Sequence, residues 1–414
     1  MKVLLVTMYF PPSGGGGVQR PLKIATHLPE LGIETHVLAP DDSKWIHRDE
    51  HLPMPTLAWV HRARFLGPRG RKPAEELHGM AGLERYSLQL QLFGRRLLVP
   101  DEGVPWNITA IPAAIKIVRD EGIDVVITTS PPGSVHLIGA AVKAATSARW
   151  VADLRDSLVA HPHRDSQRLL VRVKEQGQHG VARLIASQAD GISAVSEAIA
   201  EEMRTRNPHG PVVTIANGSD FDDFSGLEYH AGAENFRITH AGSFFGKRDP
   251  RPFLTALSRV DGVVARFLGD FRAADREWSA NILDRMELIP YAPHRRSLAL
   301  QRDSEALLLL IPEAGGRGRG VLSGKVFEYL AAERPILALV PPDGAAAELL
   351  RQTGVGVIVA PDDVDGIARE LEAMRDRWRA GKLEPAQLSE EWKQKLSRRA
   401  RVQDLADLLN RITG

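Results

Sequence analysis

A glycine- and arginine-rich loop that leads into a helix contains the residues best suited to binding an anion. It lies in Ile311–Leu330 (IPEAGGRGRGVLSGKVFEYL), where a strand-like run precedes the loop and Ser323, Gly324 and Lys325 begin the helix. Backbone N–H groups, a helix dipole and nearby cations together form an anion site, and a diphosphate suits it. Glu328, about one turn further on, can accept hydrogen bonds from ribose hydroxyls. The alternative is a solvated Glu–Lys pair above an ordinary loop.

A second stretch, His240–Pro252 (HAGSFFGKRDPRP), has the same character. A strand-like run enters a turn at Gly242 and Ser243, whose small size permits the close approach of a ligand. Lys247 and Arg248 follow, and both cations can reach a leaving phosphate. Surface basic residues are common, so this stretch alone is weak evidence for a phosphate site. The evidence is stronger because we expect the stretch to lie on the same sheet edge as the Lys325 loop.

The loop Pro11–Arg20 (PPSGGGGVQR) places Gly14, Gly15, Gly16 and Gly17 between a buried strand-like run and a helical pattern. Four glycines have no side chains to pack and lose much backbone entropy on folding. Such a costly loop favours the interpretation that its bare backbone forms a surface under a ligand. The alternative is a flexible strand-to-helix connection. The loop matches neither G-x-G-x-x-G nor G-x-x-x-x-G-K-[ST].

The stretch Val151–Leu158 (VADLRDSL) places Asp153, Arg155 and Asp156 directly after a strand-like run. Two carboxylates and one guanidinium are suited to orienting hydroxyl groups or an acceptor. The alternative is a buried Asp–Arg pair that fixes a loop.

The stretch Thr129–His136 (TSPPGSVH) also begins a helix after a strand. Ser134 is a candidate helix N-cap on the acceptor side, and His136 is either an acceptor-side residue or packs within the helix. His161 and His163 have no clear partner, and we assign them no metal-binding role.

Strand-like and helix-like segments alternate along the chain, which predicts an α/β fold with two doubly wound Rossmann-like domains that face each other across a cleft. We expect an N-terminal acceptor-side domain over 1–220 and a C-terminal nucleotide-sugar-binding domain over 221–395. The segment 396–414 is expected to form an amphipathic helix that packs back on the N-terminal domain. Residues 41–105 interrupt the alternation, and we expect irregular structure there.

Composition excludes several classes of protein. The 414 residues carry a formal net charge of +1, which gives no argument for nucleic-acid binding. The absence of cysteine excludes disulfides and fits a reducing cytoplasm. No apolar stretch approaches the ~18 residues that span a membrane, and the N-terminus does not read as a secretory signal.

The basic segment 61–73 (HRARFLGPRGRKP) has several Lys and Arg residues and no acid. It favours a solvated loop or one that contacts a soluble acceptor. The alternative is peripheral contact with an anionic membrane surface, at the inner face of the membrane, that presents a lipid-linked acceptor.

The glycine loop together with the motifs NGSD, HAGSFFGKRDP and SGKVFEYLAAERPILAL resembles the retaining family 4 type of glycosyltransferases, which have the B-type two-domain fold. The resemblance extends over nearly the whole chain, and DLRD and SPPGS indicate a separate subgroup. It implies transfer of a sugar from a nucleotide diphosphate sugar to a hydroxyl acceptor, with retention, without an obligatory metal and without a cofactor. A UDP or dTDP type of donor is favoured.

Carried over by position, Glu328 matches the second glutamate of the E-x7-E motif, which holds the ribose, and Arg248 falls where a diphosphate-binding lysine is usual. We therefore predict that the donor binds at Gly16, Gly17, Gly242, Ser243, Arg248, Gly320, Val321, Ser323, Lys325 and Glu328. The predicted catalytic residues are Asp153, Arg155, Asp156, Arg248 and Lys325. Gly14 and Gly15 are predicted to lie on the acceptor side, with Ser134 and His136.

Three positions depart from the family pattern. Gly320 stands where the first glutamate of E-x7-E is expected, Ser243 replaces the arginine that follows the turn glycine, and Arg155 falls where many relatives carry a histidine. Arg317 and Arg319, with Lys325, are candidates to supply part of the missing charge.

These observations predict a cytoplasmic sugar-nucleotide glycosyltransferase that acts on a glycan, lipid-linked glycan or natural product. Two alternatives stay open at this point. One is a sugar-nucleotide epimerase on the same fold, and the other is a non-catalytic nucleotide-sugar-binding partner of another transferase.

Overall fold

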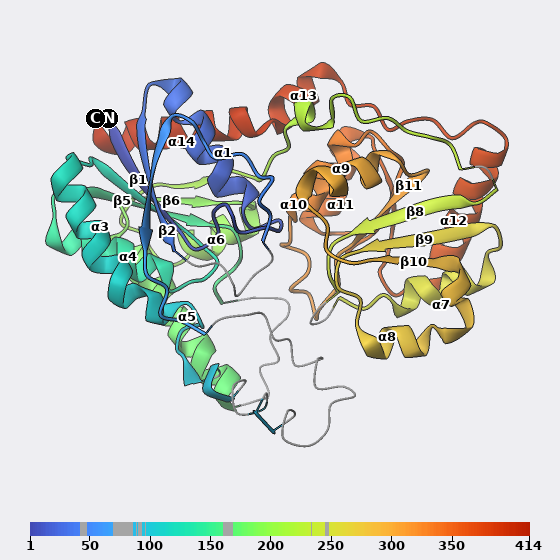
Figure 1. The fold of residues 1–414 in the computed structure, drawn as a ribbon, viewed down its shortest axis with the longest axis horizontal. Coiled ribbons are helices and arrows are strands. Elements are labelled where there is room, and N and C mark those ends of the chain that lie inside the picture. The colour runs from blue at the N-terminus through green and yellow to red at the C-terminus, as the bar shows by residue number, and fades with distance from the viewer. Residues whose placement is uncertain are drawn as a thin grey trace. The chain divides into compact units, whose positions relative to one another are not determined.

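The computed structural model describes residues 1–41, 48–68, 86–87, 89, 93–95, 97–159, 169–232, 234–244 and 248–414. These residues form two compact units. The first unit comprises Met1–Ala216 and Arg398–Gly414, and the second comprises Asn217–Ser397. Each unit has a parallel sheet covered by helices, so the predicted α/β class with two doubly wound units is confirmed (Figure 1).

The sheet of the first unit has seven parallel strands in the order β3-β2-β1-β4-β5-β6-β7. Its inner strand β1 (KVLLVT) is buried beyond its first residue and mostly apolar, as a strand covered on both faces must be. The strands are β1 (Lys2–Thr7), β2 (Glu34–Pro40), β3 (Ala58–Ala63), β4 (Val125–Thr129), β5 (Arg149–Leu154), β6 (Gly191–Ala194) and β7 (Val212–Thr214).

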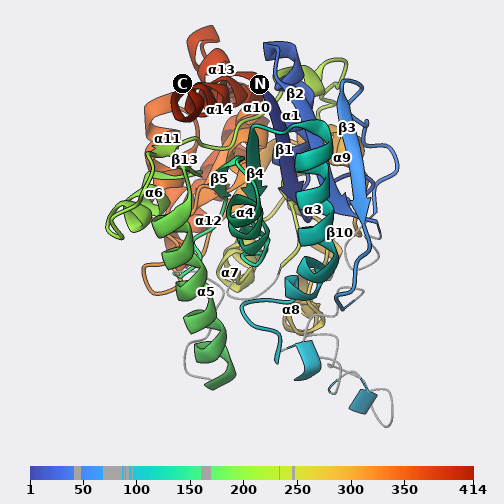
Figure 2. The same ribbon diagram turned by 90° about the vertical axis from the view of Figure 1, so that its left-hand side faces the viewer.

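Helices cover both faces of this sheet. The α1 and α14 helices share one apolar core with the sheet, and α3 and α4 share another. Figures 1 and 2 show these helices beside the strands. The helices are α1 (Gln19–His27), α3 (Asn107–Glu121), α4 (Val135–Ala145), α5 (Leu169–Gln188), α6 (Glu197–Arg204) and α14 (Arg398–Thr413), with short 3-10 turns η1 (Pro29–Leu31) and η3 (Val104–Trp106). The two chain ends lie close together, since the Thr413 hydroxyl is 3.9 Å from the sulfur of Met1.

The prediction of irregular structure over 41–105 was wrong for part of that segment. Ala58–Ala63 forms β3, which pairs in parallel with β2 at the edge of the sheet. An edge strand that is partly exposed needs no continuous apolar run, and so this segment (AWVHRA) lacks the pattern of a buried strand.

The sheet of the second unit has six parallel strands in the order β10-β9-β8-β11-β12-β13. They are β8 (Phe236–Ala241), β9 (Val263–Leu268), β10 (Met286–Ile289), β11 (Ala306–Leu310), β12 (Ile336–Leu339) and β13 (Val357–Val359). The central strands β8 and β11 are neighbours although distant in sequence. Their carboxyl ends therefore bring the two predicted anion-binding stretches to one edge.

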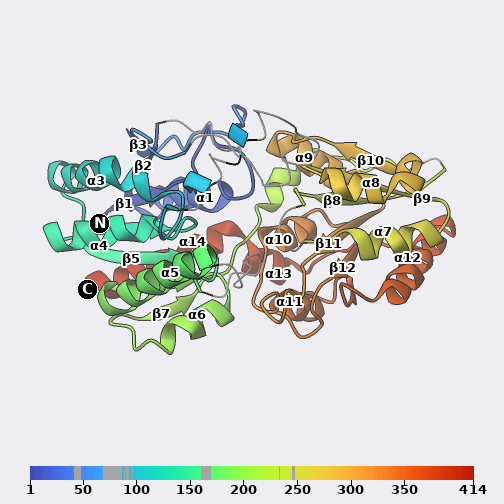
Figure 3. The same cartoon turned by 90° about the horizontal axis from the view of Figure 1, so that it is seen from below.

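The helices of the second unit are α7 (Arg251–Arg259), α8 (Ala273–Trp278), α9 (His294–Arg302), α10 (Gly324–Ala331), α11 (Ala345–Thr353), α12 (Val364–Arg379) and α13 (Glu390–Leu396), with 3-10 turns η4 (Phe221–Phe224) and η5 (Ala280–Arg285). The α7 and α12 helices pack side by side and complete the core of Phe236, Leu254 and Leu371 (Figure 3).

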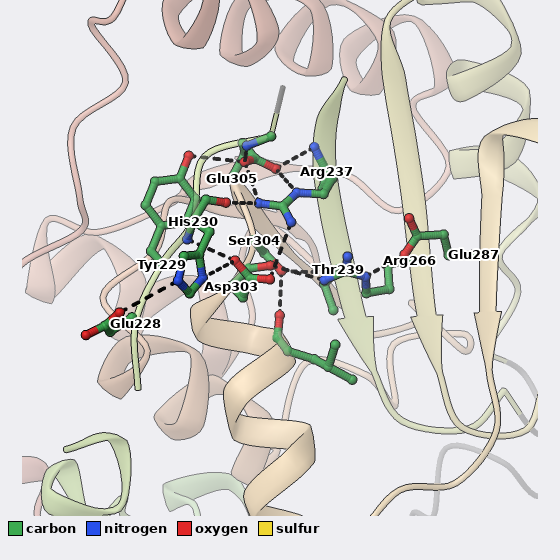
Figure 4. Close-up of polar contacts among 12 residues, drawn as sticks. Glu228, Tyr229, His230, Arg237, Thr239, Arg266, Glu287, Asp303, Ser304 and Glu305 are labelled. Atoms are coloured by element: carbon green, nitrogen blue, oxygen red, sulfur yellow. Dashed lines mark hydrogen bonds and ion pairs between the residues drawn. The ribbon is translucent and has the colours of Figure 1, made fainter. Parts of the chain in front are cut away.

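A buried carboxylate fastens the polar segment that precedes β8 to this sheet (Figure 4). Glu305, at the start of β11, accepts hydrogen bonds from the Gly232 N–H at 2.7 Å, the Tyr229 hydroxyl at 3.1 Å and the Arg237 guanidinium at 2.8 Å. Burial by itself raises the pKa of Glu305, but the bonds from Arg237 and Gly232 outweigh it and leave the pKa below its ordinary value. Glu305 therefore fixes this segment as an ion-paired carboxylate.

Candidate functional site

The two anion-binding stretches of the second unit meet at the carboxyl ends of β8 and β11. The Lys325 Nζ, from the first turn of α10, lies 3.4 Å from the Nε2 of His240 at the end of β8. It also lies against the backbone of Gly242, because an added Cβ there would overlap the Lys325 amine. Gly242 has a φ of 132°, which only glycine adopts readily. The fold thus unites Gly242 and Lys325 as the sequence predicts.

His240 is a buried member of this site to which the sequence interpretation gave no role. Its Nδ1 donates to the carbonyl oxygen of Leu308 at 2.8 Å, which leaves Nε2 facing the Lys325 amine. Burial, and then the charges of Lys325 and Arg248, hold the pKa of His240 well below its ordinary value. His240 is therefore a neutral acceptor. A polar residue that ends a central strand beside a glycine turn was the available signal.

Lys325 is held in place by its own helix. The Ser323 Oγ accepts the Lys325 N–H at 3.4 Å, as an N-cap does. Burial, and next the nearby Arg248 charge, lower the pKa of Lys325 well below its ordinary value, while Glu328 acts in the opposite direction. A bound anion would oppose both of the effects that lower it. The site therefore has the electrostatics of one that receives an anion.

Arg248 adds a second cation and is half-buried. Its Nη1 donates to the Ser243 carbonyl at 3.1 Å, and burial lowers the pKa of its guanidinium. The hydroxyl of Ser243 is hydrogen-bonded to Asp270, which fixes the turn. Lys247 lies outside the described residues.

The loop between β11 and α10 is shaped by backbone conformation. Ala314, Gly315 and Gly316 all have positive φ, at 50°, 67° and 84°. Arg319 is exposed and forms ion pairs with Glu313 at 3.4 Å and with Asp343 at 3.2 Å. Its charge is thus already balanced by two carboxylates, which weakens the expectation that it replaces missing charge at the anion site.

Other predicted donor residues lie along the same loop and helix. Gly320 and Val321 are half-buried in the loop before α10. Glu328 is half-buried one turn after Lys325, close enough to act on the pKa of that lysine. Glu328 and Lys325 therefore occupy one end of α10 together.

In the first unit, the glycine loop follows β1 and leads into α1. Gly14 is buried, Gly15 and Gly16 are exposed, and Gly17 is half-buried against the Tyr9 ring. Gly15 has a φ of 90°, which explains its glycine. At Gly16 an added Cβ meets no described atom within 4 Å. The fold therefore has room for a side chain at position 16. The presence of glycine there favours contact between the backbone of this loop and a ligand.

Two guanidinium groups clamp this loop at its two ends. Arg155 donates to the carbonyls of Gly17 and Ser130. Arg62 donates to the carbonyls of Pro11 and, at 3.1 Å, of Pro40. Arg62 falls within the basic segment 61–73, whose residues from 69 onward lie outside the described part of the chain. Arg155 and Arg62 thus act as positioning residues for the glycine loop.

Asp153 is buried in an ion pair with a partner that the sequence did not suggest. Its carboxylate accepts from Arg20, at 2.7 and 3.0 Å, from Thr129 at 2.7 Å and from Ser193. Burial alone would raise the pKa of Asp153, but the Arg20 charge and these hydrogen bonds lower it to about 2. Asp153 therefore joins α1, β4, β5 and β6, while Asp156 is exposed. Their catalytic roles stay predictions.

Ser134 occupies the N-cap position of α4, but the prediction that its side chain caps the helix was wrong. Ser134 precedes α4, but its hydroxyl donates to Asp101 at 2.6 Å and caps nothing. Asp101 instead accepts the Ser134 N–H at 2.8 Å, because a carboxylate is the stronger acceptor at a helix N-terminus. His136 is buried, with its Nδ1 2.8 Å from the Thr128 hydroxyl, and burial lowers its pKa to about 3. His136 thus packs within the helix.

His161 and His163 lie outside the described residues. Among the residues that are described, no group of three or more His, Asp or Glu side chains is arranged to hold a metal ion. No helix in the described part of the chain combines the length and apolar character needed to cross a membrane.

Residues 15–218 match the family model described as glycosyl transferase 4-like domain. The matched residues fall almost entirely within the first unit. This match includes most of the glycine loop and the DLRD stretch, and it ends within the NGSD motif. A search of curated proteins finds no match.

Solved structures of glycosyltransferases share the fold over almost the whole chain. Sucrose-phosphate synthase from Thermosynechococcus elongatus superposes with a TM-score of 0.66 at 14% identity, covering 99% of this chain and 98% of that one. HepE of Anabaena in complex with UDP-glucose gives 0.63 at 14% identity, covering 99% of both chains. The UDP-forming trehalose-phosphate synthase from Burkholderia xenovorans, in complex with glucose-6-phosphate, gives 0.61 at 11% identity over 99% of both chains. The chain has the B-type glycosyltransferase fold.

Proposed function

We propose that the protein is a retaining glycosyltransferase that moves a sugar from a nucleotide diphosphate sugar to a hydroxyl acceptor. The observation that carries this proposal is the meeting of Lys325, Arg248 and the Gly242 turn beside neutral His240 at the carboxyl ends of β8 and β11. The glycosyl transferase 4-like domain supports sugar transfer. The structure of HepE with UDP-glucose supports a nucleotide sugar as donor.

The diphosphate binds at this cation cluster in the proposed mechanism. Negative charge grows on the phosphate oxygen as the glycosidic bond breaks, and fixed cations and backbone N–H groups stabilise that charge without reorganising. Lys325 and Arg248 are placed for this role, and the first turn of α10 adds its dipole. Glu328 accepts hydrogen bonds from the ribose hydroxyls. These hydroxyls do not change between the ground state and the transition state.

No side chain of the described site stands out as a covalent nucleophile. Substitution on the same face of the sugar is therefore the mechanism we propose, with the leaving phosphate helping to take the acceptor proton. The glycine loop, positioned by Arg155 and Arg62, contributes the acceptor side. We also propose that the reaction needs neither a metal nor a cofactor and that the donor base is uridine or thymidine.

Thermal unfolding with UDP, dTDP, GDP, ADP and their sugars tests the binding half of the proposal. A nucleotide at about 100 times its dissociation constant should stabilise the fold by about 2.7 kcal/mol. Lys325→Ala should abolish this shift, whereas Arg369→Ala, which removes an exposed cation of the same unit, should keep it. If no nucleotide raises the unfolding temperature, the donor site is misplaced.

Product analysis tests the chemistry. We expect nucleoside diphosphate release coupled to an acceptor, with slow donor hydrolysis in its absence, and both should persist in excess EDTA. Complete loss of activity in EDTA that magnesium or manganese restores would contradict metal independence. Conversion of the donor sugar without acceptor would establish an epimerase, and binding without any turnover would establish a non-catalytic partner.

A further inference from the structure

A cavity with a volume of about 440 Å³ lies within the second unit, and none of its lining residues belongs to the predicted donor site. The turn η4, the ends of α9 and α10, and the helix α13 form its walls. Its lining is mostly polar: Phe221, Asp222, Phe224, Ser225, Arg302, Ala331, Glu333, Glu390, Lys393, Gln394 and Ser397. A volume of this size accommodates a small ligand.

A chain of alternating charges runs along the cavity wall. The Glu333 carboxylate pairs with Arg302 on one side and with Lys393 on the other, each at 3.2 Å. Lys393 also pairs with Glu390 at 3.0 Å. These side chains come from α9, from the end of α10 and from α13, so three elements converge on Glu333.

The backbone of Glu333 adopts a left-handed conformation that is unfavourable for a residue with a side chain. It directly follows Ala332, the C-cap of α10, and has a φ of 52°. This left-handed conformation after a helix is the place where glycine is preferred, and a residue with a Cβ is less stable in it. A strained residue that keeps a functional side chain is a recognised sign of a site. The carboxylate explains why glutamate stands there.

The charge pattern favours a neutral ligand rich in hydroxyl groups. An anion would face Glu333, Glu390 and Asp222, and a cation would face Arg302 and Lys393. A hydroxyl group both donates and accepts hydrogen bonds. It can therefore bond to the carboxylates and to the cations of the cavity wall without disrupting the ion pairs between them. The Arg302 Nε is buried and has no hydrogen-bond partner among the described residues, which leaves a donor for such a group.

Aromatic rings complete this chemistry. Phe221 and Phe224 line the same cavity, and the Arg302 guanidinium lies 5.6 Å from the centre of the Phe224 ring. Saccharides combine apolar C–H faces with hydroxyl groups, and a cavity that offers rings beside donors and acceptors matches both. We propose that this cavity is a saccharide-binding site separate from the transfer site, sized for a mono- or disaccharide.

Saturation-transfer NMR on the full chain tests the proposal, with glucose, galactose, mannose, maltose, cellobiose and lactose as probes. We expect at least one saccharide to bind with a dissociation constant of about 1 mM, which is normal for a small polar ligand. Glu333→Gln should weaken this binding about tenfold or more. Glu333→Gly also removes the carboxylate, while the backbone there favours glycine, so it separates lost binding from misfolding. Glu348→Gln, at an exposed site on α11, is the matched control.

Lys325→Ala separates this site from the transfer site. Binding that survives Lys325→Ala but is lost in both Glu333 variants supports the proposal. Binding that survives Glu333→Gln but is lost in Lys325→Ala would place the saccharide at the donor site, and would overturn this proposal while leaving the proposed function intact. Absence of binding by every saccharide, or Glu333-dependent binding of inorganic phosphate or spermidine alone, would also overturn it.

Discussion

Lys325, Arg248 and Glu328 lie close together, and the proposed mechanism gives them different tasks. Lysine and arginine charges act on a phosphate whose charge grows in the transition state, whereas a ribose carboxylate acts equally on both states. The sequence predicted all three positions on different grounds: Glu328 matches the second glutamate of E-x7-E, Arg248 falls where a lysine is usual, and Lys325 begins a helix after a glycine-rich loop. Their roles stay predictions. The sequence interpretation gave His240 no role, because its position beside a glycine turn is only a weak signal until the fold brings Lys325 to its Nε2.

Kinetics of single variants should separate these tasks. Lys325→Ala and Arg248→Ala should each lower turnover ten- to over a hundredfold, since hydrogen bonds to charged groups are worth roughly 1.5–3 kcal/mol. Glu328→Gln should mainly weaken nucleotide affinity and leave turnover near that of the unmodified enzyme. Steady-state rates and nucleoside diphosphate titrations measure both quantities. Folded Lys325→Ala and Arg248→Ala variants with full turnover would show that the diphosphate binds elsewhere.

The buried His136 should make the first unit sensitive to acid. Its pKa falls from its ordinary value near 6.5 to about 3 in the folded chain because burial disfavours the charged ring. Between those values the unfolded chain binds more protons, so stability is complete above about pH 6.5 and falls as the pH decreases, by up to about 1.4 kcal/mol per pH unit. Urea unfolding at pH 7, 5 and 4 measures this slope.

A matched variant isolates the histidine from other acid-sensitive groups. His136→Asn keeps a polar atom near the Thr128 hydroxyl but cannot take up a proton in this range. Its stability should therefore depend less on pH between 6.5 and 4 than that of the unmodified chain. Equal slopes for the two proteins would show that His136 is already protonated in the folded state.

At the scale of elements, the buried strand β1 was predictable from the sequence and the partly exposed edge strand β3 was not. The buried strand-like run before the glycine loop is β1 (KVLLVT), whose interior residues are apolar because the strand is covered on both faces. The edge strand β3 has no such run and was missed. The cap of α4 was also missed, since Asp101 lies far from Ser134 in sequence and only the fold joins them.

The glycine loop is the element whose function is easiest to test. Gly16→Val should lower turnover about tenfold or more, equivalent to at least about 1.4 kcal/mol in the barrier, because a side chain would occupy the surface intended for a ligand. Stability should change little, since a Cβ at Gly16 meets no described atom. Gly15→Ala should instead lose stability, as its φ of 90° strains any other residue.

Kinetics and thermal unfolding of Gly16→Ala and Gly16→Val, taken as a graded pair, decide between the two interpretations of this loop. A folded Gly16→Val enzyme with unchanged kinetics would favour the flexible connection over the ligand-binding surface. An intermediate effect of Gly16→Ala would agree with a ligand that passes close to the backbone.

At the scale of the whole molecule, the first unit is built from both ends of the chain. Its core contains β1 residues from the start of the sequence and the apolar face of α14 from its end. The second unit is therefore inserted between two parts of one core. The stability of the first unit must depend on the last residues of the sequence as strongly as on its central strands.

Paired substitutions on α14 measure this dependence. Leu405 and Leu409 are buried in the core of the first unit, while Gln403 and Asn410 of the same helix are exposed. Each buried Leu→Ala change should cost about 2–5 kcal/mol, a large share of the ~5–15 kcal/mol that stabilises a typical domain. The double variant Leu405→Ala/Leu409→Ala should lower the calorimetric unfolding temperature of the first unit by more than about 10 °C. Gln403→Ala/Asn410→Ala should leave it nearly unchanged, because alanine keeps or raises the helical propensity of α14. An equal loss in both double variants would show that the buried leucines contribute no more to stability than the exposed face of this helix.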